Sequence, residues 1–309
     1  MEAVSILLPV YRPNLLWLQE QLGSIADQTC SAFRCVVSHD GSLDSFLADQ
    51  IKSVLPDDRF TLVLGSKHLG TYKHVEYLIS EFGLKTTFFA LCDQDDIWLP
   101  NKLESQISRL IYSEVSVVSN NGQIVNEKLE SIRGLTTFEW FGISQKHERF
   151  ASIRNQITGA SALFRSDRFV KCVPFPENVD VAIHDHWMYI AALSTGGAFF
   201  DVEPLWLYRQ HDGNQIGASA QSGWFSRALK GIQKSRRMLR NRYLLRDDSV
   251  IRQGKIFLSA AELRWSSDVL KNDVLNCKLS RTDRIRLLRP ATLLGSSLES
   301  LRVAISQQK

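Results

Sequence analysis

The chain of 309 residues lacks both of the glycine-rich loops that commonly bind nucleotide phosphates. No Gly-x-Gly-x-x-Gly follows the first expected strand, and no Gly-x-x-x-x-Gly-Lys followed by Ser or Thr occurs anywhere. Dinucleotide-binding and P-loop functions are therefore disfavoured. If a nucleotide binds to this protein, a cation must meet its phosphates in place of a glycine-rich helix start.

Long apolar runs and paired cysteines are also missing. No stretch approaches the roughly 20 apolar residues that span a bilayer. The first ten residues contain an acid and no basic segment, so we expect no signal peptide. The cysteines are odd in number and have no metal-type spacing: Cys30, Cys35, Cys92, Cys172 and Cys277. We expect reduced thiols, a cytoplasmic location and no structural zinc.

Acidic residues are scarce in the last third of the chain. After Gly217 there are 19 Lys and Arg against seven Asp and Glu, a net charge of +12, whereas residues 1–217 carry −8. We therefore predict a globular domain over residues 1–217 and a basic helical region over residues 218–309. A basic region attached to an acidic body indicates an anionic surface as its partner.

Basic and apolar side chains alternate at helical spacing over residues 224–245. This pattern is typical of amphipathic helices that lie on anionic bilayers, and residues 256–275 and 284–305 also have helical patterns. The alternative is a small helical bundle whose basic face is merely solvated. Nucleic acid is disfavoured because no stacking platform accompanies the charges. We expect peripheral docking on the inner face of the cell membrane.

Apolar β-forming stretches alternate with helical patterns in the first hundred residues. We expect strands at residues 4–10, 33–38, 60–64 and 86–92 with helices between them. This alternation predicts an α/β fold with a mostly parallel sheet flanked by helices. Ligands of such sheets bind at the carboxyl ends of strands. Because Tyr11, Asp40 and Asp93 follow strand ends, we expect them to line one crevice.

The remaining part of the domain is predicted to be less regular. A helix is expected at residues 102–112, and a strand at 115–119 is followed by a tight turn at Asn121-Gly122. Residues from 124 to about 150 are predicted to be a mobile loop. Further strands are expected at residues 156–164, 198–202 and 205–208, and a helix within residues 183–196.

Three carboxylates follow the strand at residues 86–92: Asp93, Asp95 and Asp96. Crowded buried carboxylates repel one another unless a cation or hydrogen-bond donors compensate. One interpretation is a hard divalent ion held partly by diphosphate oxygens. The other is an acidic turn in which Asp96 caps the next helix. This stretch alone leaves both open.

A second set of polar groups begins the helix within residues 183–196. Asp185 lies at its first turn, where an anion is stabilised, and it is either an N-cap or a general base in a partly apolar setting. For His184 and His186 we favour hydrogen-bonded positioning of the loop over metal ligation. Gly159 lies among small residues and either admits a substrate to the backbone or simply eases packing.

A third set follows the strand at residues 205–208. Arg209 and His211 precede a glycine turn, which is a pattern compatible with a phosphate or cation site. The alternative is a solvated loop.

Six motifs in a fixed order resemble glycosyltransferase family 2, and within it the bacterial rhamnosyltransferase-like group. They extend over about residues 4–217. The motifs are Pro-Val-Tyr (Pro9–Tyr11), Asp-Gly-Ser-x-Asp (Asp40–Asp44), Asp-Gln-Asp-Asp-x-Trp (Asp93–Trp98), Thr-Gly-Ala (Thr158–Ala160), His-Asp-x-Trp (His184–Trp187) and Tyr-Arg-Gln-His-x-x-Asn-x-x-Gly (Tyr208–Gly217). Two positions depart from the family's usual pattern, because His39 replaces an Asp and His186 replaces a Trp.

The resemblance implies a GT-A fold and inverting transfer of a sugar from a nucleotide diphosphate, with Mg²⁺ or Mn²⁺ as cofactor. It implies that Asp185 is the catalytic base. The residues implied to bind the donor nucleotide are Pro9, Tyr11, Asp40, Asp93, Arg209 and His211. The implied metal ligands are Asp95, Asp93 and His211. The residues implied to contact the donor or acceptor sugar are Gly159, His184, His186, Trp187 and Trp98.

The resulting hypothesis is transfer of L-rhamnose from dTDP-L-rhamnose to a lipid-linked saccharide in the synthesis of an O-antigen or capsule-type polysaccharide. Within the same fold, UDP-galactose or UDP-N-acetylglucosamine is the alternative donor. A non-catalytic nucleotide-sugar-binding module is a further alternative, but the full set of acidic groups argues against it. A nucleotidyltransferase is disfavoured because its phosphate loop is missing.

Overall fold

The computed structural model describes residues 4–42, 45–143, 148, 151–152, 155–179, 184–211 and 248–265. Its strands are β1 (Val4–Val10), β2 (Phe33–His39), β3 (Phe60–Leu64), β4 (Phe88–Leu91), β5 (Ile97–Trp98), β6 (Val117–Val125), β7 (Ser131–Thr136), β8 (Ala162–Arg165) and β9 (Ala198–Arg209). Its α-helices are α1 (Leu15–Ala26), α2 (Ser45–Ser53), α3 (Thr71–Glu81), α4 (Lys102–Tyr112), α5 (Thr137–Phe141), α6 (Ser166–Phe169), α7 (His184–Thr195) and α9 (Asp248–Trp265).

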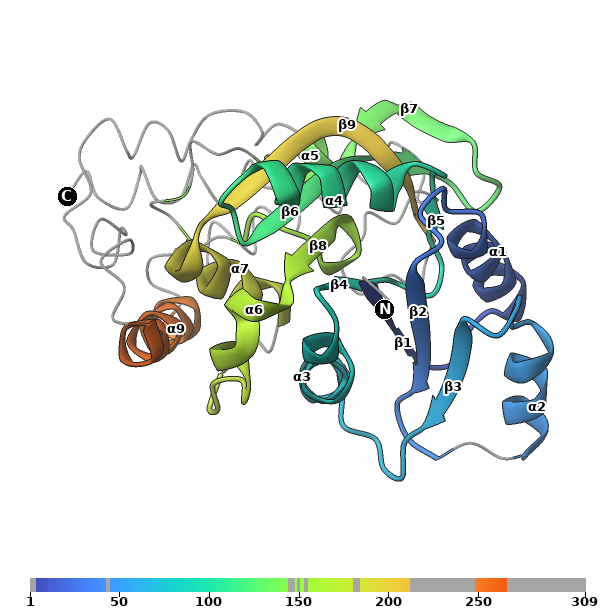
Figure 1. Cartoon of the computed structure of the whole chain (residues 1–309), viewed down its shortest axis with the longest axis horizontal. Coiled ribbons are helices and arrows are strands. Elements are labelled where there is room, and N and C mark those ends of the chain that lie inside the picture. Colours follow the sequence, from blue (N-terminus) through green and yellow to red (C-terminus); the bar gives the residue numbers. More distant parts are fainter. Residues whose placement is uncertain are drawn as a thin grey trace, which may run out of the picture.

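The predicted parallel sheet is confirmed. The strands form one sheet in the order β3-β2-β1-β4-β8-β6-β9-β5, and β7 pairs with β6 (Figure 1). Strands β3, β2, β1 and β4 are parallel to one another, and β6 is parallel to β9. Strand β8 runs antiparallel between β4 and β6. The order reverses beside β1, so the carboxyl ends of β1 and β4 face a natural ligand crevice.

Apolar side chains on both faces of the sheet explain why helices cover both sides. In β1, Leu7 joins one buried cluster while Ile6 and Leu8 join the other. Figure 1 shows α1 and α2 on one side of β1–β3 and α3 on the other. Helix α1 begins at Asn14, whose side chain accepts hydrogen bonds from two backbone N–H groups of the first turn.

Helix α9 belongs to the same core as α7. Its Phe257 and Ala261 are fully buried in the cluster that contains Trp187 and Met188. A helix was expected at residues 256–275, and α9 begins eight residues earlier, at Asp248. Residues 266–275, like the predicted helices at 224–245 and 284–305, lie outside the described residues. No helix in the described part of the chain has the length and apolarity needed to span a membrane.

The predicted tight turn at Asn121-Gly122 is wrong, because both residues lie inside β6. The indole of Trp206 in β9 packs directly on Gly122, where a Cβ atom would come within 2.6 Å of it. The Asn121 side chain accepts a hydrogen bond from the N–H of Gly122, at the point where the pairing of β6 with β9 shifts register. The glycine therefore makes room for a large ring, and the asparagine accompanies a bulge rather than a hairpin.

The predicted loop from residue 124 to about 150 is also partly wrong. It contains the end of β6, strand β7 and helix α5. Thr136 and Glu139 form a capping box at the start of α5. The two strands expected at residues 198–202 and 205–208 are one strand, β9, with Pro204 at an irregular position. Of the strand expected at 156–164, only β8 forms, preceded by a 3-10 turn at Gly159–Ser161.

Candidate active site

Tyr11 and Asp40 meet at the carboxyl ends of β1 and β2. Asp40 is only 4% exposed, and its carboxylate accepts hydrogen bonds from the N–H groups of Leu69 (2.7 Å) and Gly70 (2.9 Å). Its Oδ2 atom also lies 2.9 Å from Nδ1 of His68. The Tyr11 ring stacks on the His68 ring, with 4.7 Å between centroids. The predicted neighbourhood of Tyr11 and Asp40 is therefore present, but the carboxylate of Asp40 is directed to the His68 loop.

The peptide group of Tyr11 is held to the acidic stretch. Its N–H donates to Oε1 of Gln94 (2.9 Å), and its carbonyl accepts from Nε2 of the same side chain (3.2 Å). Pro9 lies two residues earlier in β1, paired in register with Ser38. The first strand and the loop after β4 are therefore tied together beside the crevice.

The acidic loop carries its three carboxylates in different environments. The side chain of Asp93 is accessible to solvent. Nearby protein atoms still desolvate its carboxylate. Asp95 lies with its Oδ2 2.7 Å from Nε2 of His211, which is the second residue after β9 and also packs against Trp17. Asp96 is fully buried and accepts the N–H of Arg209 (3.1 Å). Its role is to anchor the loop to β9, not to cap α4, where Asn101 is the N-cap residue.

Asp185 lies in the first turn of α7, as predicted, and is 8% exposed. Burial raises its pKa to about 7, although the side chain of Asn155 and the N–H groups of Gly159 and His186 donate hydrogen bonds to its carboxylate and lower the pKa. Within the described residues its Oδ1 atom has no hydrogen-bond partner. It is a carboxylate that is held in place and has one buried oxygen without a hydrogen-bond partner in this part of the chain.

Asp93 connects the acidic loop with α7. Its pKa is raised first by desolvation and then by the charges of Asp95 and Asp185. The two charges come from segments about 90 residues apart in the sequence, and both are close enough to act on Asp93. The fold therefore brings Asp95 and Asp185 near enough to Asp93 for both charges to raise its pKa.

Gly159 and His184 lie against each other beside this site. A Cβ atom on Gly159 would come within 2.9 Å of Nε2 of His184 and 3.1 Å of Cδ1 of Leu91. Burial lowers the pKa of His184 to about 4, so the ring is neutral at neutral pH. The close approach expected for a substrate at Gly159 is instead made by the imidazole of His184.

Arg209 was expected to lie near the diphosphate, and the structure shows that its side chain is buried against the acidic loop. The side chain is 1% exposed, and its Nε donates to the carbonyl of Asp95 (2.8 Å) while its Nη2 pairs with Glu20. Its Nη1 donates to the carbonyl of Glu127 (2.8 Å), and the guanidinium lies over Trp17. Arg209 therefore supports the acidic loop from behind instead of facing the crevice.

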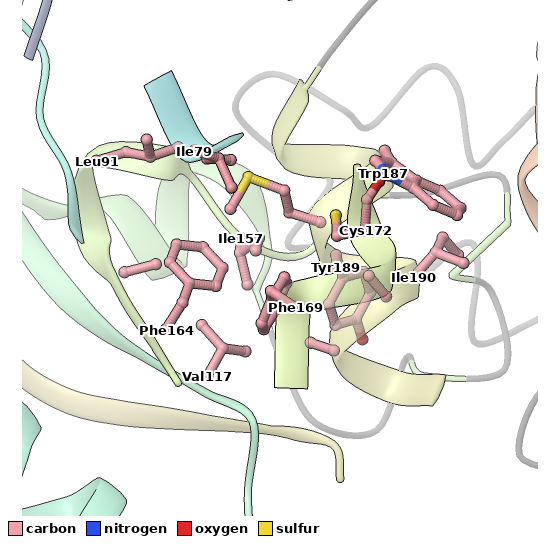
Figure 2. Packing of buried hydrophobic residues seen from close by; sticks show 14 of the residues in the cluster. Ile79, Leu91, Val117, Ile157, Phe164, Phe169, Cys172, Trp187, Tyr189 and Ile190 are labelled. Carbon is pink, nitrogen blue, oxygen red and sulfur yellow. Dashed lines mark hydrogen bonds between the residues drawn. The ribbon is translucent and has the colours of Figure 1, made fainter. Parts of the chain in front are cut away.

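Both tryptophans expected to contact a sugar are core residues. Trp98 is 2% exposed, and the buried ammonium of Lys102 lies 4.2 Å from its ring centroid. Trp187 is fully buried, and its indole donates to the carbonyl of Cys172 (3.0 Å), next to which it lies in Figure 2. His186 is 5% exposed and faces α9. These three side chains shape the site through packing, and direct sugar contact does not fit their burial.

The fit of a divalent cation depends on the acidic loop and His211. In the described part of the chain, no group of three or more His, Cys, Asp or Glu side chains is arranged to hold a metal ion. Asp95 nevertheless offers a carboxylate oxygen, the kind of ligand that Mg²⁺ and Mn²⁺ prefer, and His211 lies beside it with an imidazole nitrogen, a weaker ligand for these ions. The crowding of Asp93 with Asp95 and Asp185 is unfavourable charge that a cation would relieve. The residues fit an ion that takes its remaining ligands from a bound diphosphate.

Comparison of the sequence with models of known protein families identifies its family. The family model described as Glycosyl transferase family 2 matches residues 5–169, slightly more than half of the chain. The chain belongs to glycosyl transferase family 2. It is therefore a glycosyltransferase, and the resemblance inferred from the motifs is confirmed.

Two relatives illustrate the range of this family. A dTDP-rhamnosyl transferase, RfbG of Shigella flexneri, is 25% identical over 219 residues, covering 66% of this chain and 71% of its own length. The UDP-Glc:alpha-D-GlcNAc-diphosphoundecaprenol beta-1,3-glucosyltransferase WfgD of Escherichia coli is 28% identical over 131 residues, which is 40% of this chain and 47% of that protein.

A solved structure confirms the GT-A fold. The crystal structure of S. aureus TarS residues 1–349, in complex with UDP-GlcNAc, aligns with a TM-score of 0.53 at 14% identity and covers 98% of this chain and 91% of that one. At this identity the likeness concerns the fold alone.

Several residues of this family 2 site were not found from the sequence. His68, Gln94 and Asn155 all bond to predicted site residues. Each lies in a loop with no periodicity, so only the three-dimensional structure reveals it. Glu20 is different, because it lies on the polar side of α1 and could have been suggested as the counter-ion of a buried arginine.

Proposed function

We propose that this family 2 glycosyltransferase is an inverting, metal-dependent enzyme that transfers L-rhamnose from dTDP-L-rhamnose to a lipid-linked saccharide in cell-surface polysaccharide synthesis. The observation that carries the proposal is the gathering of Asp185 with Asp93 and Asp95 at one site. Inversion needs a base on the acceptor side and charge stabilisation on the side of the leaving diphosphate. The two sets of carboxylates supply these two requirements.

Asp185 is the proposed base. The acceptor hydroxyl oxygen forms a bond to the anomeric carbon as the bond from that carbon to the diphosphate oxygen breaks, and Asp185 takes the hydroxyl proton. A fixed carboxylate with a pKa of about 7 suits this task at neutral pH. General-base assistance of this kind contributes about 10²–10⁴ in rate. Asn155 and the N–H of Gly159 hold the carboxylate in position.

Asp95 and His211 are the proposed ligands of Mg²⁺ or Mn²⁺, together with Asp93. When bound, the ion supplies positive charge that offsets the charge developing on the diphosphate. This chain has neither of the two glycine-rich phosphate loops whose backbone N–H groups would otherwise meet that charge. Arg209 supports the ligand loop through the carbonyl of Asp95, and Glu20 balances its charge.

The donor is proposed from the recognised rhamnosyltransferase-like motifs and from the name of RfbG, which is a dTDP-rhamnosyl transferase. The lipid-linked acceptor is proposed from the name of WfgD, which refers to a diphosphoundecaprenol. The basic residues after Gly217 support docking on the anionic inner face of the cell membrane. The exposed rings of Tyr11 and His68 are the surface on which we place the donor base.

A donor-panel assay tests this function. The full chain is incubated with membrane glycolipid acceptor, with Mn²⁺ or EDTA, and with dTDP-L-rhamnose, UDP-galactose or UDP-N-acetylglucosamine. We expect transfer from dTDP-L-rhamnose that is lost with EDTA. Transfer from a UDP-sugar alone would overturn the proposed donor, and full activity in EDTA would overturn metal dependence.

Flotation with lipid vesicles tests the location. The protein should float with vesicles rich in anionic lipid and remain unbound with neutral vesicles. Equal binding to both kinds of vesicle would contradict the electrostatic docking of the basic region.

A further inference from the structure

The first turn of α7 is held from outside by α9, a helix far beyond the residues that the family model matches. Nε2 of Gln253 in α9 lies 3.3 Å from Nδ1 of His186, which is the residue after the proposed base. Gln253 and His186 are both nearly fully buried, at 4% and 5% exposed. This buried contact between Gln253 and His186 therefore holds the first turn of α7, which carries Asp185.

The hydrogen-bond partners of the two ring nitrogens of His186 determine which nitrogen carries the proton. Nε2 of the imidazole lies 2.6 Å from the carbonyl oxygen of Ala151, which can only accept a hydrogen bond, so this nitrogen carries the proton. Burial lowers the pKa of His186 to about 4, so the ring is neutral and Nδ1 is an acceptor. The amide N–H of Gln253 therefore donates to Nδ1. The ring joins the segment at Ala151 to α9.

Both ends of this bridge reach Asp185. The backbone N–H of His186 donates to the carboxylate of Asp185, and the side chain of Asn155 donates to it from the segment that follows Ala151. Asn155 is itself fixed by hydrogen bonds with the backbone of Ile157 (2.7 Å and 3.2 Å). A displaced His186 ring would thus disturb two of the hydrogen bonds that orient the carboxylate.

Other residues of α9 also pack against the start of α7. The ring of Phe257 meets His186 edge-on, with 5.3 Å between centroids, and lies 5.5 Å from the centroid of Trp187. Nη1 of Arg264 donates to the carbonyl of Cys172 (2.9 Å), and its guanidinium lies over Trp187. Helix α9 is therefore also held against Trp187 and against the backbone at Cys172.

We propose that Gln253 is a positioning residue for the proposed base, acting through the imidazole of His186. Helix α9 is then part of the catalytic unit, although it lies within the region predicted as a basic appendage. Gln253 touches no reacting atom in this scheme. This inference rests on the proposed role of Asp185.

The test compares Gln253→Leu with wild type in the full chain. Leucine is close in size but donates no hydrogen bond. We expect kcat to fall about tenfold, because small misplacements of a catalytic group cost up to about 10²-fold. The KM for the donor should stay within about twofold of wild type, since the donor side of the site is untouched. The ¹⁵N resonance of His186 Nδ1, assigned with His186→Gln, should shift as its hydrogen bond is lost.

Two control variants on α9 separate positioning from general packing. Ser259→Ala lies on the exposed side of α9 and should behave like wild type. Leu258→Ala removes core contacts of α9 but leaves the amide of Gln253 in the sequence. At an equal loss of melting temperature it should retain more kcat than Gln253→Leu. Wild-type kcat in Gln253→Leu, an unmoved His186 resonance, or an equal kcat loss in Leu258→Ala would each overturn the inference. Failure of the proposed base would be seen independently, as full activity of Asp185→Asn.

Discussion

The carboxylate of Asp185 suits the role of a base because burial disfavours its ionisation while hydrogen bonds favour it. Burial raises its pKa to about 7, while hydrogen bonds from Asn155 and two backbone N–H groups keep it from rising further. A base with a pKa near the working pH combines a usable fraction of carboxylate with adequate proton affinity. The same carboxylate in solvent would be a weaker base, and a fully unsupported buried one would stay protonated.

Asp185→Asn should remove the base with little change in shape. We expect kcat to fall by about 10²–10⁴, because the amide cannot accept the proton. Binding of the nucleotide-sugar donor, measured by calorimetry, should stay near that of wild type. The thermal unfolding midpoint should not fall, since a costly buried charge is removed. The matched control is Asp49→Asn, a largely exposed position in α2, which should leave kcat unchanged.

Gly159→Ala should test the packing of His184 on the backbone. The new methyl group would lie 2.9 Å from Nε2 of His184 and 3.1 Å from Cδ1 of Leu91, so the imidazole must move. We expect a loss of stability of about 1–3 kcal/mol, as for other overpacked sites, and a fall in kcat because the N–H of Gly159 also holds Asp185. Denaturant unfolding and initial rates measure the two effects.

Gly23→Ala is the matched control for this substitution. Gly23 lies inside α1 with nothing within 4 Å of the position of its Cβ. Alanine there should stabilise the protein by about 0.5–1 kcal/mol through helix propensity. If both alanine variants keep wild-type rates, the close contact of Gly159 with His184 has no functional importance.

At the scale of elements, segments with a regular apolar pattern were predictable from the sequence. A short strand that forms only by pairing with a distant strand was not. Helix α7 and the parallel strands β1 to β4 follow from apolar periodicity and strand–helix alternation. Strand β5 is only two residues long and exists because it pairs with β9, a partner more than a hundred residues away. No local pattern encodes such pairing. The capping box of Thr136 and Glu139 was a readable signal that could have predicted α5.

The residues of the candidate site were also predictable only in part. Motif order identified the carboxylates that meet, Asp93, Asp95 and Asp185. Motif order does not distinguish a side chain that faces the ligand from one that supports it, so it did not reveal that Arg209 and Trp187 are buried. Both are large side chains whose burial depends on neighbours from distant elements, α1 for Arg209 and α9 for Trp187.

The end of β9 and the acidic loop act as one unit through Arg209. Arg209→Lys keeps the charge but loses the fork that bonds both the carbonyl of Asp95 and Glu20. Groups that orient metal ligands typically contribute 10–100-fold in metal affinity. We therefore expect the Mn²⁺ concentration for half-maximal activity to rise about tenfold, measured by titration at saturating donor.

Arg109→Lys is the control for this loop. Arg109 pairs with Asp201 at a largely exposed position on α4, away from the acidic loop. This variant should keep the wild-type Mn²⁺ requirement. An unchanged requirement in Arg209→Lys as well would contradict the supporting role of Arg209.

At the scale of the whole molecule, the acidic loop and the start of α7 carry carboxylates that burial and, in the loop, mutual repulsion make harder to ionise. Asp93, Asp96 and Asp185 all have raised pKa values, with desolvation as the largest cause for each. An acid whose folded-state pKa exceeds its unfolded value of about 3.9 binds more protons when folded. The stability that this proton binding gives to the folded state is complete at pH values below the unfolded-state pKa. It is lost as the pH rises through the folded-state pKa. For Asp185 this window runs from about pH 4 to about pH 7.

Protons and a divalent cation should therefore compete for the same site. Without metal, the contribution of these carboxylates to stability declines as the pH rises across that window. Mn²⁺ should bind the ionised carboxylates and restore stability, so it should raise the melting temperature more at pH 8 than at pH 5.5. Differential scanning calorimetry with Mn²⁺ and a nucleoside diphosphate, against EDTA, measures both values. Asp95→Asn should abolish the increase at pH 8, because it removes a ligand that sits against His211. An increase that is equal at both pH values, or that survives in Asp95→Asn, would show that Mn²⁺ binds elsewhere on the protein.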